Sequence, residues 1–145
     1  MVGCQRIAMV AITRHGSAML NTLGPLLPAA DLFVAPRFAD LLAGVGNRVI
    51  TIDGKVGAAV GELFGSYDQL LFTFSIGAAV RLIAPHLRGK EVDPGVVVVD
   101  DSGRFVIPIL SGHQGGANAF AEQLAKGLGA TAVVTTASEA RGTIA

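Results

Sequence analysis

The stretch that decides the fold is Arg104-Phe-Val-Ile-Pro-Ile-Leu110, followed directly by Ser111-Gly-His-Gln-Gly-Gly-Ala-Asn118. Its first segment is apolar and rich in residues that favour strands. After the glycines, apolar side chains recur at the spacing of one helix face, at Ala117, Phe120, Ala121, Leu124 and Leu128. The stretch therefore predicts a strand, a glycine-rich turn and a helix N-terminus in succession.

The rest of the chain alternates strand-like and helical segments, which is typical of an α/β fold. We expect strands over residues 6–13, 31–35, 48–52, 69–74, 96–101, 104–109 and 131–135. Only Ser102 and Gly103 separate the fifth strand from the sixth, which predicts an antiparallel hairpin in an otherwise mainly parallel sheet. The expected architecture is three-layered, with helices on both faces of the sheet and residues 1–145 forming a single domain.

Two further helices are predicted from apolar faces. The first should bury Val56, Ala59, Val60, Leu63 and Phe64. The second should begin after Ser75, a plausible N-cap, and turn inward Ile76, Ala79, Val80 and Ile83. Gly24-Pro25 and Pro28 should disturb the helical segment that follows the first strand.

The composition excludes several classes of protein. The formal net charge of +0 gives no electrostatic reason to bind nucleic acid or an acidic membrane. Although 51% of the residues are hydrophobic, glycine, proline and polar residues interrupt every apolar run before it reaches the ~18 residues of a membrane span. A signal peptide is not expected, and the lone Cys4 cannot form an internal disulfide, so we expect a cytoplasmic protein.

The predicted turn offers groups that can act on a ligand. A helix N-terminus presents backbone amides and a partial positive charge, and Gly115 and Gly116 would let an anion or a carbonyl group approach the main chain. His113 is suited to act as a general base, or it only hydrogen-bonds the turn. Ser111 and Asn118 are caps or ligand-positioning groups, and Ser111 lacks the sequence context of an activated nucleophile.

We expect this turn at the carboxyl edge of the sheet, where ligands of open parallel sheets bind. Segment 75–77, with Ser75 and Gly77, should lie at the same edge, so that it and the 111–118 turn line one cleft. Asp101, or its neighbour Asp100, could orient His113 there or serve only in the hairpin turn.

Three other polar residues are weaker candidates for ligand binding. Arg81 could pair with a substrate carboxylate or remain a solvated surface charge. Thr135 and Thr136 end the last predicted strand. His15 and His86 show no spacing that would build a metal site with other ligands, so no protein-held metal is expected.

Four blocks carry a resemblance to a known family. They are Glu62-Leu-Phe-Gly-Ser-Tyr-Asp68, the segment from Ser75 to Pro85, the segment from Asp93 to Asn118, and the segment from Leu128 to Ala137. In order and spacing they resemble the N-terminal part of the cobalamin-biosynthesis protein G (CbiG) family, the cobalt-precorrin-5A hydrolases. Family members continue into a further domain, which the resemblance implies as a partner, together with other enzymes of the pathway.

The resemblance implies a chemistry for the turn. His113 would activate water against the δ-lactone of cobalt-precorrin-5A, whose opening releases a two-carbon fragment as acetaldehyde. Amides near Gly115 and Gly116 would stabilise the oxyanion or bind carboxylates of the macrocycle. No cofactor is implied, because the cobalt belongs to the substrate. The alternative is a non-catalytic corrinoid-binding domain. A nucleotide-binding domain is disfavoured, because the chain has no phosphate-binding loop.

Overall fold

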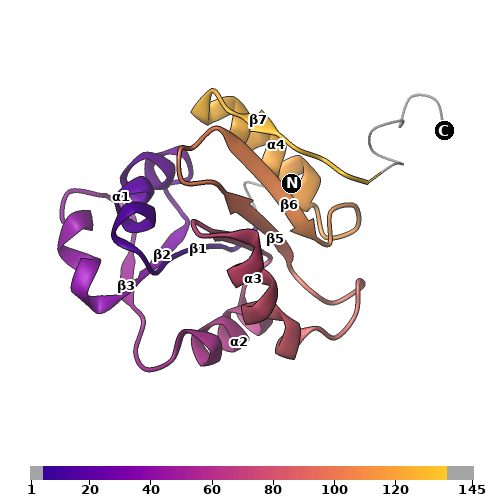
Figure 1. Ribbon diagram of the computed structural model, residues 1–145, viewed down its shortest axis with the longest axis horizontal. Helices are drawn as coiled ribbons and strands as arrows, with labels where there is room; N and C mark the ends of the chain where they lie inside the picture. The colour runs from indigo at the N-terminus through magenta and orange to yellow at the C-terminus, as the bar shows by residue number, and fades with distance from the viewer. Residues whose placement is uncertain (1–4, 137–145) are drawn as a thin grey trace.

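The computed structural model describes residues 5–136 of the 145-residue chain, so Cys4 lies outside the described residues. Its centre is a seven-stranded sheet in the order β3-β2-β1-β4-β5-β6-β7, with helices on both faces (Figure 1). The three-layer α/β prediction is therefore confirmed for this part of the chain. The strands are β1 (Ile7–Ala11), β2 (Asp31–Val34), β3 (Val49–Thr51), β4 (Gln69–Phe72), β5 (Gly95–Val99), β6 (Phe105–Leu110) and β7 (Thr131–Ala132).

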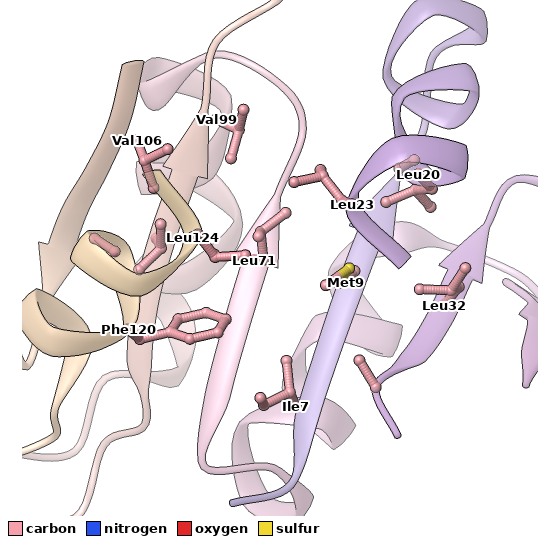
Figure 2. Packing of buried hydrophobic residues seen from close by; sticks show 14 of the residues in the cluster. Ile7, Met9, Leu20, Leu23, Leu32, Leu71, Val99, Val106, Phe120 and Leu124 are labelled. Carbon is pink, nitrogen blue, oxygen red and sulfur yellow. The ribbon is translucent and has the colours of Figure 1, made fainter. Parts of the chain in front are cut away.

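Hydrophobic side chains assign each helix to one face of the sheet. Leu20 of α1 and Phe120 and Leu124 of α4 join one buried cluster with Met9 and Leu71 of the sheet (Figure 2). Burying side chains of this size contributes about 1.5–3 kcal/mol each. The helices are α1 (Arg14–Leu23), α2 (Val56–Ser66), α3 (Ile76–Ile83) and α4 (Ala117–Leu128), with short 3-10 turns η2 (Gly24–Leu26), η3 (Pro36–Leu42) and η4 (Ala84–His86).

The opposite face is covered by α2 and α3. Val60 and Phe64 of α2 and Ile83 of α3 form the second buried cluster with Phe72 and Val98. Figure 1 shows α1 and α4 above the sheet in this view, and α2 and α3 below it. The predicted inner faces of α2 and α4 are confirmed, with Val56, Ala59 and Leu128 only partly buried.

For α3 the predicted N-cap is correct, but the predicted buried face is partly wrong. Ser75 caps the helix by accepting a hydrogen bond from the Ala78 amide at 3.2 Å. Ala79 and Ile83 are buried as expected, but Ile76 is 40% exposed and Val80 is 49% exposed. The helix has eight residues and packs on the sheet through Ala79 and Ile83, so Ile76 and Val80 lie at the solvent-exposed border of the contact.

Strand direction decides where the candidate residues lie. Strands β1 to β5 run parallel, β5 and β6 form the predicted antiparallel hairpin, and β7 runs parallel to β6. We call the edge where β1–β5 begin the amino edge, and the edge where they end the carboxyl edge. Because β6 runs in the reverse direction, its last residue Leu110 pairs with Val96 near the start of β5. The turn after β6 therefore lies at the amino edge.

The expectation that the 111–118 turn lies at the carboxyl edge shared by β1–β5 is wrong. The six residues of β6 span roughly 20 Å at the usual strand rise, and they separate this turn from the hairpin loop. Within β6, α4 and β7, however, the usual rule still applies, because the turn and residues 133–136 follow the carboxyl ends of their own two strands.

No helix in the described range 5–136 is long and apolar enough to cross a membrane.

Candidate functional site

The site begins with a strained residue at the end of β6. Ser111 adopts φ 55°, a left-handed conformation that residues other than glycine rarely take and that favours a functional role when the surroundings enforce it. Its hydroxyl donates to the carbonyl oxygen of Asp93 at 3.1 Å. Its own carbonyl accepts from the Ala117 amide at 3.2 Å, so Ser111 connects the turn to the start of α4.

Glycines allow the chain to fold back this tightly. A Cβ on Gly115 would lie 2.8 Å from the Ser111 carbonyl oxygen, and one on Gly112 would lie 2.6 Å from Oδ1 of Asn118. Gly116, at φ +82°, is the left-handed residue from which α4 begins. These close approaches explain the Gly-rich sequence of the turn without reference to any ligand.

Asn118 brings the end of the last strand to the turn. Its side chain is 2% exposed, and Nδ2 donates to Oγ1 of Thr136 at 2.8 Å. The structure thus brings together five of the candidate residues, Ser111, Gly115, Gly116, Asn118 and Thr136. Thr135 lies beside them in the chain and is exposed.

His113 is exposed at the tip of the turn. Two helix amides near it are already used inside the turn, since Ala117 donates to Ser111 and Asn118 donates to the Gly112 carbonyl at 3.0 Å. Binding of an oxyanion by the amides near Gly115 and Gly116 stays a prediction.

The remaining candidates gather at the carboxyl edge instead. Ser75 and Asp101 line an open cavity of about 430 Å³ whose floor includes Phe74 and Val98. Gly77 is on the first turn of α3, and a Cβ there would lie 3.9 Å from Nη1 of Arg81, so that guanidinium folds back toward the same edge. The expectation of one cleft lined by residues 75–77 and 111–118 is wrong, because the reversal of β6 places these segments at opposite edges.

Of the two alternatives given for the hairpin aspartates, the structure excludes the first, because neither residue lies near enough to orient His113. Asp101 and Asp100 precede β6 and His113 follows it, so the length of the strand lies between them. The Asp101 carbonyl instead lies 2.9 Å from Nε2 of His15 at the start of α1.

Asp100 organises the hairpin loop. Its carboxylate accepts from the Ser102 hydroxyl at 2.6 Å and from the amides of Phe105 at 2.7 Å and Arg104 at 2.9 Å. Burial acts to raise the pKa of Asp100, but the bonds from Ser102, Phe105 and Arg104 outweigh it and hold the pKa below its ordinary value of 3.8. Asp100 is thus a structural residue of the loop.

Asp100→Ala should lower the free energy of unfolding near pH 7 by about 1 kcal/mol, the size of a typical side-chain cap. Because the folded-state pKa is lowered, this stabilisation is present above the unfolded-state pKa and is lost as the pH falls through the folded-state value. Urea denaturation should show the difference from wild type at neutral pH, and the difference should shrink as the pH is lowered into the acid range. Asp101→Ala, at a carboxylate without hydrogen bonds to the described residues, is the control, and an equal loss there would contradict the assignment.

Sequence reasoning missed two residues that hold the turn. The main-chain carbonyl of Asp93 accepts a hydrogen bond from the Ser111 hydroxyl, and its buried carboxylate accepts from the amides of Arg88 and Gly89. Gln69, at the start of β4, donates from Nε2 to the Gly115 carbonyl oxygen at 2.6 Å. A polar residue opening a strand of four buried residues was the available signal for Gln69. The described residues contain no group of three or more His, Cys, Asp or Glu side chains that could hold a metal ion.

Fold and site together define a doubly wound α/β domain in which a strained, glycine-rich turn presents a histidine beside a helix N-terminus. The cobalamin synthesis G N-terminal family matches residues 58–139, more than half of the chain. The chain belongs to this family, as the resemblance predicted.

Known proteins extend the similarity beyond the matched segment. The chain is 42% identical over 137 residues to the cobalt-precorrin-5A hydrolase of Priestia megaterium, and 37% identical over 135 residues to that of Salmonella typhimurium. These alignments cover 94% and 93% of this chain and 36% of each relative, so the chain spans about a third of their length. A crystal structure of a cobalamin biosynthesis protein G homolog from Sulfolobus solfataricus has the same fold, with a TM-score of 0.66 at 22% identity over 94% of this chain and 39% of that one.

Proposed function

We propose that this domain takes part in the hydrolysis of cobalt-precorrin-5A during anaerobic cobalamin biosynthesis, opening the δ-lactone with release of acetaldehyde. The observation that carries the proposal is the 42% and 37% identity to two cobalt-precorrin-5A hydrolases across nearly the whole chain. The substrate is then a corrinoid intermediate that brings its own cobalt, and no protein-held cofactor is required. The single cysteine favours the reducing cytoplasm as its compartment.

Of the two edges of the sheet, the amino edge, where the 111–118 turn lies, is the better candidate for the reaction site. The turn follows the carboxyl end of β6 and lies beside residues that follow β7. It contains the strained Ser111 and is held by three bonds, from Ser111 to Asp93, from Gln69 to Gly115 and from Asn118 to Thr136. Strain that the surroundings enforce is a feature of functional sites. Ser75, Gly77, Arg81 and Asp101 lie at the other edge and are not part of this proposed site.

Each residue of the turn has a defined proposed role. His113 acts as the general base that activates water against the lactone carbonyl. The amides of Gly115 and Gly116 stabilise the negative charge that develops on that carbonyl oxygen. Ser111, Asn118, Thr135 and Thr136 offer hydroxyl and amide groups to the carboxylates at the rim of the macrocycle, with Asn118 and Thr136 already bonded to each other.

A non-catalytic corrinoid-binding role is the second candidate. It is favoured by one observation, that the chain spans 36% of the relatives' length, so that residues supplied by the remaining part could complete the reaction site. In that case a further domain of the family architecture is the required partner.

Incubating the purified chain with cobalt-precorrin-5A and measuring acetaldehyde tests the proposal. We expect release by the chain alone, at a rate proportional to its concentration. Binding without release, together with release by a full-length relative under the same conditions, would establish the binding role and contradict the catalytic one. Absence of both binding and release would contradict the proposed function altogether.

A further inference from the structure

Gln69 is an unusual residue for its position in the sheet. It opens β4, which lies between β1 and β5 near the middle of the sheet, and its side chain is 0% exposed. Nε2 donates to the Gly115 carbonyl oxygen at 2.6 Å, with a longer contact of 3.4 Å to Oε1 of Gln5. Oε1 is buried and has no hydrogen-bond partner in the described part of the chain. A buried polar atom left without a partner is destabilising and calls for an explanation.

Neighbouring residues leave room for this glutamine. A Cβ on Gly95, opposite it on β5, would overlap Oε1 of Gln69. A Cβ on Gly116 would lie 3.3 Å from Nε2 of Gln69. The side chain therefore fills a narrow space between two glycines, directly beneath the turn, and its amide has little freedom to point elsewhere.

The packing alone does not require an amide at this position. The three residues that follow Gln69 in β4, Leu70, Leu71 and Phe72, are fully buried hydrocarbons, and an unbranched apolar side chain of similar length would fill the same space. What only the amide supplies is the bond to Gly115, two residues from His113 in the chain. The amide thus stabilises the conformation of the turn through Nε2, while burial of its unpartnered Oε1 lowers the free energy of unfolding.

We propose that Gln69 is a positioning residue, which holds the Gly115 carbonyl and thereby fixes the orientation of the turn that presents His113. The inference rests on the proposed function for its effect on catalysis. The part of the inference that concerns the conformation of the turn depends only on the bond between Gln69 and Gly115. Ser111 and Asn118 attach the two ends of the turn to Asp93 and Thr136, and Gln69 attaches its middle to the centre of the sheet.

The test compares Gln69→Met with Leu71→Met, a volume-conserving change in the same strand. For Gln69→Met we expect an unfolding temperature close to that of wild type, because removal of the unpartnered Oε1 offsets the loss of the bond to Gly115. Amide hydrogen exchange at Ala117 and Asn118, whose amides are bonded to the carbonyls of Ser111 and Gly112, should become faster by about tenfold, since the turn opens locally. The kcat for acetaldehyde release should fall by about tenfold or more, with a smaller change in KM. Leu71→Met should change neither exchange at the turn nor kcat.

The outcomes separate this inference from the proposed function. Unchanged exchange and unchanged kcat in Gln69→Met would overturn the positioning role, as would equal losses of stability and activity. Faster exchange at the turn in a protein that releases no acetaldehyde even as wild type would support the positioning role and contradict the hydrolase proposal. Gln69→Leu is the second variant, and the same exchange measurement on it decides the matter if Gln69→Met does not fold.

Discussion

His113→Ala is expected to lower the rate of acetaldehyde release by about 10²-fold or more, the loss typical for removal of a general base. The side chain is exposed at the tip of the turn, and bonds through Ser111, Gly115 and Asn118 attach the turn to the rest of the fold. Removing the imidazole should therefore leave the unfolding temperature and the affinity for the corrinoid nearly unchanged. Single-turnover acetaldehyde assays, calorimetry and a binding titration measure the three quantities.

His15→Ala is the matched control for this experiment. His15 is also exposed, but it lies at the carboxyl edge, 2.9 Å from the Asp101 carbonyl. Its removal should leave acetaldehyde release at the wild-type rate. If His15→Ala lowers release and His113→Ala does not, the reaction takes place at the carboxyl edge and the assignment of the turn is wrong. If His113→Ala lowers stability and affinity together, the histidine orders the turn and the binding role is favoured.

Periodicity in the sequence predicts the layers of this fold because burial acts on local patterns. The i, i+3, i+4 spacing in α4 names the residues that pack on the sheet, and the run Val96–Val99 predicts a strand covered on both faces. Only at α3 did the face differ, where Ile76 and Val80 remain exposed because the short helix contacts the sheet through Ala79 and Ile83.

Placing the site required the direction of each strand, which a local pattern does not contain. The hairpin between β5 and β6 was predicted from Ser102 and Gly103, and it is present, with Gly103 at φ 70°. Its consequence is that the turn directly after β6 lies at the edge opposite to the segments directly after β4 and β5. Ser75 and Asp101 were therefore grouped with His113 because all three follow strands, although the strands point in opposite directions.

The residues that support the turn could not be found from the sequence because their contacts are long-range. Gln69 and Gly115 are 46 residues apart in the chain, Ser111 and Asp93 are 18 apart, and Asn118 and Thr136 are 18 apart. Each bond forms only when the sheet order brings β4, β5 and β7 around the end of β6. The sequence shows such residues only as polar positions next to apolar strands.

Gly115→Ala should have the second large effect, because the turn has no space for a side chain there. The new methyl group would lie 2.8 Å from the Ser111 carbonyl oxygen and would overlap Cβ of Ser111, a residue already strained at φ 55°. Relieving the overlap requires the turn to open, which should reduce the free energy of unfolding by about 1–3 kcal/mol, as is usual for overpacking. A displacement of His113 by about 1 Å should reduce acetaldehyde release by about 10²-fold.

Gly65→Ala makes the same chemical change where the space is open. A Cβ on Gly65, near the end of α2, would meet nothing within 4 Å. Because alanine favours the helical conformation over glycine, this variant should gain about 0.5–1 kcal/mol of stability and keep full activity. Urea denaturation and acetaldehyde assays on both variants measure the contrast. If Gly115→Ala matches Gly65→Ala in both assays, the turn tolerates a side chain, and its glycines are then neither a steric requirement nor evidence for a rigid site around His113.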